Sequence, residues 1–154
     1  MLAYYKKKGL IFEISYKKEI EGIRLVEKFE NKKERSSLSD QAFREISLYL
    51  DGKLEKFSFP INIKGTDFQK RVRREIEKIP YGKTISYKKI GEKINSKAYQ
   101  AIGTACGKNP ILLRIPCHRV VGSKDMGGFA YGVYLKKKLL ELEGALFNFN
   151  TNIK

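Results

Sequence analysis

One cysteine and the single histidine of the chain are neighbours in the run Ile115-Pro116-Cys117-His118-Arg119-Val120. A free thiol has a pKa of about 8.5 and is a weak nucleophile until a nearby base or cation helps it lose its proton. Proline has a fixed φ and biases the residue before it toward extended geometry, which gives the cysteine a defined backbone position. The run therefore predicts a nucleophilic cysteine with a base beside it.

The second cysteine, Cys106, lies 11 residues before Cys117 and follows no metal-ligand spacing. Two cysteines and one histidine cannot supply a conventional four-ligand zinc site, so no metal is expected. Cys106 stands between an alanine and a glycine near the end of a predicted helix, and we expect it to be a small buried residue. A disulfide is not expected if the protein works in a reducing compartment.

The chain carries a formal net charge of +15, and this charge is unevenly distributed. Residues 62–144 hold 18 Lys and Arg against 7 Asp and Glu, a net of +11, whereas residues 1–61 have a net of only +3. The cationic excess therefore lies on the half that carries the cysteine. This pattern is typical of a polyanion-binding protein, but a lysine-rich solubilising surface explains it equally well.

The chain contains no run of about 18 apolar residues, which a membrane span requires, and no apolar segment follows its first residues. We therefore expect a cytoplasmic protein without a membrane-bound form. A hydrophobic fraction of 42% is enough for a packed core.

The first predicted unit covers residues 1–61 and contains no candidate catalytic residue. Residues 10–16 and 23–29 are rich in β-branched and aromatic side chains, and the polar turn between them predicts a hairpin. A helix is expected to begin near Ser39-Asp40 and to end at Asp51-Gly52. We interpret this unit as a small α/β support, with a linker at residues 62–65.

The second predicted unit covers residues 62–154 and begins with a capping box, in which Thr66 is the N-cap and Gln69 the N3 residue. The helix is expected to end at Pro80-Tyr81-Gly82. Ser86 can cap a second helix, and a third is expected over residues 97–106. Two short helices joined by a tight turn in a basic region suggest a helix-turn-helix that binds DNA, although an ordinary packed helical corner has the same pattern.

The end of the chain is expected to place Cys117. Residues 111–115 predict an apolar strand that leads the cysteine into the interior, and a glycine-rich loop follows. A last helix is expected over residues 135–143, with Gly144 just after its end, and residues 145–154 are expected to be loosely held.

Seven short motifs between residues 65 and 144 together resemble the O6-alkylguanine-DNA alkyltransferases, also called methylated-DNA–protein-cysteine methyltransferases. They are Gly65-Thr66-Asp67-Phe68-Gln69, Ile79-Pro80-Tyr81-Gly82, Ile85-Ser86-Tyr87, Asn109-Pro110, Pro116-Cys117-His118-Arg119-Val120-Val121-Gly122-Ser123, Gly127-Gly128-Phe129 and Leu139-Leu140-Glu141-Leu142-Glu143-Gly144. The resemblance implies an α+β fold. A small ribonuclease H-like α/β domain would precede a winged-helix-like domain with a helix-turn-helix.

The resemblance also implies direct reversal of DNA damage by a protein that acts once. An alkyl group would pass irreversibly from O6 of guanine in double-stranded DNA, and less readily from O4 of thymine, to Cys117. No cofactor would be consumed, and the protein would act as a monomer. Because the target atom lies inside a stacked duplex, the nucleotide must be flipped out.

The same resemblance assigns five catalytic residues. Cys117 would accept the alkyl group, His118 would take its proton through a bound water, and Glu143 would orient the histidine. Tyr87 would donate a proton or hydrogen bond to the departing guanine, which is a poor leaving group without a general acid. Asn109 would tie the DNA-binding helix to the cysteine segment.

A further ten residues are expected at the substrate or the DNA: Lys97, Tyr99, Gln100, Ala101, Gly103, Arg119, Val120, Ser123, Ala130 and Tyr131. Two of these depart from the family pattern. Gln100 stands where the family usually has an arginine that fills the space of the flipped base. Tyr131 replaces a frequent glycine at the pocket mouth, so methyl is expected to be accepted better than benzyl.

Three other functions are compatible with parts of the pattern. A non-catalytic lesion-binding relative would lack the acceptor cysteine, and a winged-helix regulator would not need Cys117, His118 and Glu143 together. A cysteine hydrolase would use a similar Cys-His-acid relay, but the basic charge and the helix-turn-helix argue against it.

Overall fold

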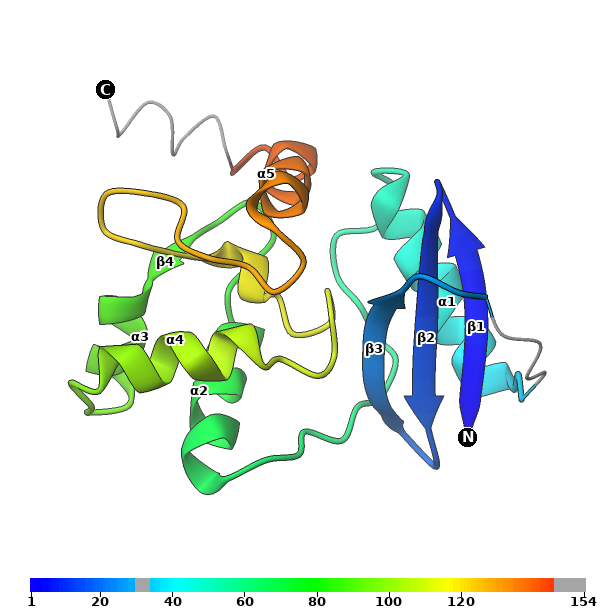
Figure 1. Ribbon diagram of the computed structural model, residues 1–154, viewed down its shortest axis with the longest axis horizontal. Helices are drawn as coiled ribbons and strands as arrows, with labels where there is room; N and C mark the ends of the chain where they lie inside the picture. Colours follow the sequence, from blue (N-terminus) through cyan, green and yellow to red (C-terminus); the bar gives the residue numbers. More distant parts are fainter. Residues whose placement is uncertain (30–33, 146–154) are drawn as a thin grey trace. The chain divides into compact units, whose positions relative to one another are not determined.

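A computed structural model describes residues 1–29 and 34–145 of the 154-residue chain (Figure 1). The chain divides into two compact units. Met1–Lys64 together with Pro110–Leu112 form the first, and Gly65–Asn109 together with Leu113–Lys154 form the second. No helix within the described ranges is long and apolar enough to cross a membrane.

The first unit is an antiparallel three-stranded sheet with one helix on its face (Figure 1). The strands are β1 (Leu2–Lys7), β2 (Leu10–Tyr16) and β3 (Ile20–Val26), in the order β1-β2-β3. Lys8 and Gly9 both have positive φ, as the two-residue turn between β1 and β2 requires. Helix α1 (Ser37–Leu50) buries apolar side chains that pack with those of the sheet. The core of this unit includes Phe12, Ile14, Ile23, Ile46 and Tyr49.

Several predicted boundaries in this unit were wrong. Strand β2 matches its predicted range, but β3 begins and ends three residues early, and β1 was missed altogether. The lysines at positions 6–8 concealed β1, in which Ala3, Tyr4 and Tyr5 are buried. Helix α1 begins earlier than predicted because Ser36 is its N-cap and Ser39 is the N3 partner in a capping box.

The second unit begins with three packed helices. Helix α2 (Asp67–Glu77) has the predicted capping box between Thr66 and Gln69. The two-residue strand β4 (Ile85–Ser86) leads into α3 (Tyr87–Lys93), which is capped by Ser86 as predicted. Helix α4 (Tyr99–Gly107) follows after a short turn, so the order helix, turn, helix is confirmed, although α4 starts two residues later than predicted.

The cysteine lies in a short turn rather than at the end of a strand. The 3₁₀ turn η1 (Cys117–Arg119) is followed by β5 (Val120–Val121), which pairs in parallel with β4. The predicted strand over residues 111–115 is wrong, because Leu113 has a φ of 71° and the segment is divided between the two units. Within this segment Ile111 forms an isolated parallel bridge with Ile23, and Leu112 and Ile115 are single bridge residues rather than parts of a strand.

The last helix, α5 (Val133–Leu142), begins two residues before its predicted start. Gly144 has a φ of 76° and follows the C-cap Glu143, so its predicted place just after the helix is confirmed. Of the tail predicted to be loosely held, Ala145 is buried, and residues 146–154 lie outside the described residues.

Candidate active site

The backbone around Cys117 forms a tight turn. Pro116 precedes the turn, and the backbone N–H of Cys117 donates to the carbonyl of Ile115 at 2.8 Å. The N–H of Arg119 donates to the carbonyl of Pro116 at 2.9 Å. Only 7% of Cys117 is exposed. The backbone position of the cysteine is therefore defined, and its side chain is almost completely buried.

Asn109 connects the end of α4 to this turn. Its side-chain Nδ2 donates to the carbonyl of Ile115 at 2.7 Å and to Sγ of Cys117 at 3.1 Å. A donor at this distance stabilises a developing negative charge on sulfur. These two bonds join the residue that follows α4 to the cysteine segment, and the part that Asn109 plays at the DNA stays a prediction.

A buried cluster of charged residues joins the cysteine turn to Glu143, which follows α5. His118 Nε2 and Glu143 Oε2 are 2.7 Å apart, and the backbone N–H of Gly82 donates to Glu143 Oε1 at 3.1 Å. Arg119 donates from Nε to Oε1 at 2.8 Å and from Nη2 to Oε2 at 3.0 Å. The sequence placed Arg119 at the DNA, but its guanidinium is buried on Glu143 because the carboxylate needs a positive partner there.

Burial and hydrogen bonding set the protonation states at this site. Burial alone would raise the pKa of Glu143, but the bonds from His118 and Arg119 outweigh it and lower that pKa to about 2. Burial lowers the pKa of His118 even though Glu143 opposes this effect. Burial also raises the pKa of Cys117, against the Asn109 bond and the charge of Lys136. The resting site therefore holds a neutral thiol beside a neutral imidazole and an ionised carboxylate.

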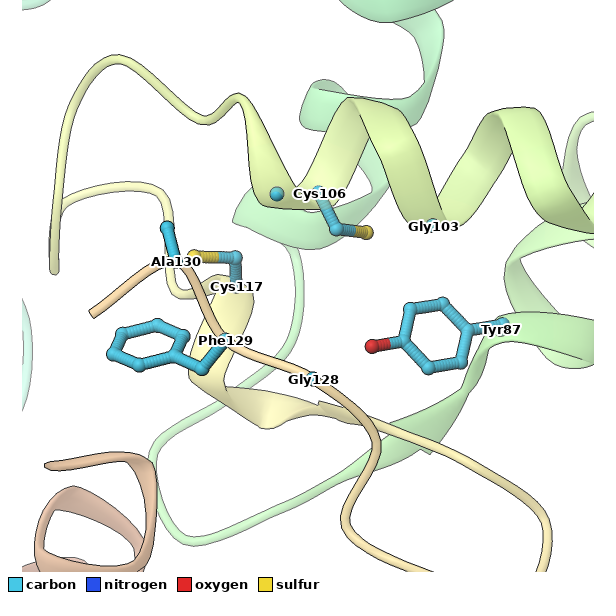
Figure 2. A pocket seen from close by; sticks show the side chains of 8 residues that line it. Tyr87, Gly103, Cys106, Cys117, Gly128, Phe129 and Ala130 are labelled. Atoms are coloured by element: carbon cyan, nitrogen blue, oxygen red, sulfur yellow. The ribbon is translucent and has the colours of Figure 1, made fainter. Parts of the chain in front are cut away.

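A cavity of about 450 Å³ opens beside the thiol (Figure 2). Its volume lies within the range that is usual for small-molecule binding sites. The lining residues come from four places: Tyr87 at the start of α3, the second half of α4, the cysteine turn η1, and the loop before α5. They are Tyr87, Gly103, Cys106, Gly107, Cys117, Gly128, Phe129 and Ala130. Most of these side chains are small, which leaves room for a planar group to approach the sulfur.

The Tyr87 hydroxyl points into this cavity (Figure 2). Burial, with a smaller effect from the two cysteines, raises the pKa of Tyr87 to about 12. The phenol therefore keeps its proton across the physiological pH range and is available as a proton or hydrogen-bond donor at the cavity wall.

Sequence reasoning missed Lys136, which is fully buried in α5. Its Nζ donates to the carbonyl of Val120 at 2.7 Å and to the carbonyl of Gly128 at 2.9 Å. A signal was present in the sequence, because Lys136 shares the helical spacing of the apolar residues Leu139 and Leu140. The second thiol, Cys106, is buried as expected, but it also lines the cavity.

The family model for the DNA-binding domain of 6-O-methylguanine DNA methyltransferase matches residues 67–145. The chain belongs to the O6-methylguanine DNA methyltransferase family. A methylated-DNA–protein-cysteine methyltransferase of Saccharolobus islandicus is 44% identical over 114 residues, which cover 74% of each chain. A protein of the same name from Metallosphaera sedula is 45% identical over 105 residues, covering 68% of this chain and 67% of that one.

Solved structures of methyltransferases of this family are similar over almost the whole chain. The Mycobacterium tuberculosis O6-methylguanine methyltransferase has a TM-score of 0.77 at 30% identity, with 94% of each chain covered. The structure of Mycobacterium tuberculosis OGT in complex with DNA has a TM-score of 0.79 at 32% identity, covering 88% of this chain and 87% of that one. The α+β fold expected from the sequence is therefore confirmed.

The other predicted contacts of this methyltransferase-family chain do not all lie in one place. Four of them are exposed together at and just before the first turn of α4: Lys97, Tyr99, Gln100 and Ala101. Gly103 and Ala130 line the cavity, whereas exposed Ser123 does not. Tyr131 is also absent from the lining, but its ring packs edge-on against Phe129 at 6.0 Å. The side chain of Val120 is buried in the core.

Proposed function

We propose that this protein repairs O6-alkylguanine, and less readily O4-alkylthymine, in double-stranded DNA by moving the alkyl group irreversibly onto Cys117. The observation that carries the proposal is the position of the thiol. It faces a base-sized cavity, accepts a hydrogen bond from Asn109 at 3.1 Å and has the buried His118–Glu143 pair next to it in the chain. Each molecule acts once, since the thioether that forms is stable.

The transfer is a displacement at the alkyl carbon. His118 accepts the thiol proton through a bound water, and Sγ of Cys117 forms a bond to the carbon as the bond from carbon to O6 breaks. The Tyr87 phenol supplies a proton or hydrogen bond to the departing guanine, which leaves intact. The ionised Glu143 stabilises the imidazolium, and Arg119 keeps the carboxylate ionised. No cofactor enters this scheme.

Because Cys117 and His118 are both buried, we infer that the thiol ionises during the reaction rather than at rest. A neutral thiol next to a neutral histidine is the less costly state in a buried site, since separated charges there lose much of their hydration. The sequence suggested that the neighbours of Cys117 keep it ionised. The pKa directions favour a proton transfer that accompanies attack on the bound base.

In this proposal the exposed start of α4 faces the DNA. Gln100 lies there in place of the usual arginine, beside the half-exposed ring of Tyr99. We infer that Gln100 bonds to the orphaned base and that Tyr99 supplies apolar contact in the space of the flipped nucleotide. We also propose that the protein acts as a monomer in the cytoplasm, where reducing conditions keep its thiols available.

A single-turnover assay tests the proposal. The protein is mixed with an equimolar duplex that carries one O6-methylguanine, and the Cys117 peptide is weighed by mass spectrometry. The expected result is a stoichiometric gain of one CH₂ unit on Cys117, with guanine restored in the DNA. Cys106→Ser should retain the transfer and Cys117→Ser should abolish it. Binding of the lesion without any mass gain would instead support a non-catalytic lesion-binding protein.

A further inference from the structure

Lys136 is a fully buried cation in the second unit that the proposed mechanism does not use. Its exposed fraction is 0%, and burial lowers its pKa to about 8. A lysine ammonium loses its hydration on burial, so a protein retains one in its core only where its hydrogen bonds and charge offset that cost. The contacts of Lys136 indicate what offsets it.

The two hydrogen bonds of Lys136 reach two separate parts of the active site. One acceptor is the carbonyl of Val120, three residues after Cys117, and the other is the carbonyl of Gly128, in the loop that lines the cavity. The ammonium is therefore a bridge between the strand that follows the cysteine turn and the loop that carries Phe129 and Ala130. These segments lie eight residues apart in sequence and are joined by an exposed loop.

The charge of Lys136 also acts on the reacting groups. It opposes the effect of burial on Cys117 and disfavours the charged form of His118, while Cys117, Cys106 and Asp125 favour the charged form of Lys136 itself. Arg73 of α2 is a second buried cation that interacts with both thiols. A positive charge in this position stabilises a thiolate and resists early protonation of the imidazole.

We propose that Lys136 is a positioning residue for alkyl transfer, which ties the cysteine segment to the pocket loop and favours the ionised sulfur during attack. This inference rests on the proposed function. The bridge fixes the distance between the sulfur and the loop on which the alkylated base would lie. Reaction rates are sensitive to such geometry, since a misplacement of about 1 Å can cost about 100-fold.

The test compares Lys136→Met, Lys136→Arg and the control Lys137→Met, which changes an exposed lysine on the same helix. Lys136→Met keeps the length and apolar stem of lysine but neither donates nor carries charge. We expect it to slow methyl transfer by about 100-fold while duplex affinity stays within about threefold. Lys136→Arg, which keeps donors and charge, should recover at least about tenfold of that loss. Lys137→Met should behave as the original protein.

A second readout separates this role from simple support of the fold. The rate of Cys117 labelling by iodoacetamide is followed against pH in the original protein, in Lys136→Met and in the control Lys137→Met. Lys136→Met should move the labelling midpoint of Cys117 to higher pH, whereas a loss of stability alone would leave the midpoint in place. An unchanged midpoint together with unchanged transfer in Lys136→Met would overturn the inference.

Two further measurements distinguish the possible outcomes. If Lys136→Met does not fold, NMR of the ¹⁵N-lysine-labelled original protein decides the question. Its slowly exchanging ammonium signal should shift when Cys117 is alkylated by iodoacetamide, and no shift would contradict the inference. If the original protein takes up no methyl group from O6-methylguanine DNA, the proposed function fails, while the labelling midpoints still report whether Lys136 acts on the sulfur.

Discussion

Arg119 and Glu143 form a buried bidentate pair, with Nε to Oε1 at 2.8 Å and Nη2 to Oε2 at 3.0 Å. The same Oε2 lies 2.7 Å from Nε2 of His118. One carboxylate therefore serves two cationic or donor partners, and the arginine supplies the permanent charge. This arrangement lets Glu143 stay ionised in a dry site while His118 changes its charge during the reaction.

We predict that Glu143→Gln impairs both stability and transfer. The amide leaves Arg119 without its counter-charge in the core, and breaking a buried pair costs about 3–5 kcal/mol. Urea unfolding at pH 7 should show a loss in this range. Methyl transfer should fall by about 100-fold or more, because the imidazolium loses its stabilising charge. Glu141→Gln, at an exposed position of the same helix, is the control; equal effects of both variants would contradict the prediction.

We predict that acid selectively removes the contribution of Glu143 to stability. Its folded-state pKa is lowered from 4.5 to about 2, so the contribution is complete above the unfolded value and is lost as the pH falls toward 2. At about 1.4 kcal/mol per unit the full effect is about 3 kcal/mol. The lowered pKa of His118 acts in the same direction below about pH 6.5.

The measurement for this second prediction is the free energy of unfolding at several pH values between 7 and 3. The original protein should lose stability steadily over that interval. The difference between it and Glu143→Gln should shrink below about pH 5. A difference that stays constant down to pH 3 would mean that Glu143 is not the titrating group.

Tyr87→Phe should slow alkyl transfer without changing the thiol. The phenol is the proton or hydrogen-bond donor that faces the cavity. General acid catalysis typically contributes about 10²- to 10⁴-fold to a rate, so we expect the transfer rate to fall by about 1,000-fold. Because burial raises the pKa of Tyr87 to about 12, its proton is retained as the pH rises.

Two rates measured in parallel check this third prediction. Single-turnover transfer from O6-methylguanine DNA reports on the whole reaction, and iodoacetamide labelling of Cys117 reports on the thiol alone. Tyr87→Phe should reduce the first rate and leave the second unchanged. A parallel fall in both rates would place Tyr87 among the groups that activate the sulfur rather than the leaving base.

Local signals predicted the second unit well. The capping box at Thr66 and the cap at Ser86 specify helix starts through short-range hydrogen bonds, and both are present as expected. The prediction of a strand over residues 111–115 was wrong for a physical reason. Its apolar run is divided between the two units, and the burial of each part within its own unit has the same sequence pattern as a strand.

The site residues that belong to family motifs could be predicted from the sequence. The roles that depend on burial in the folded structure could not. Cys117, His118, Glu143 and Asn109 come together as the motifs suggest. The buried position of Arg119 depends on a partner 24 residues away, which no local pattern reveals. The neutral state of the thiol likewise depends on desolvation, which requires the folded structure.

Our last prediction concerns the size of the alkyl group. The ring of Phe129 lines the cavity, and Tyr131 packs edge-on behind it with ring centroids 6.0 Å apart. A benzyl group occupies more of the space beside this ring than a methyl group does, so we expect the original protein to transfer methyl faster than benzyl. Tyr131→Gly removes the support of Phe129 and should raise the benzyl rate relative to methyl by about tenfold, within the range typical of pocket contacts. Single-turnover rates on O6-methylguanine and O6-benzylguanine duplexes measure the ratio, with Tyr134→Ala at an exposed position as the matched control. Faster benzyl transfer by the original protein would show that Phe129 does not limit the pocket, and an unchanged ratio in Tyr131→Gly would show that Tyr131 does not act through it.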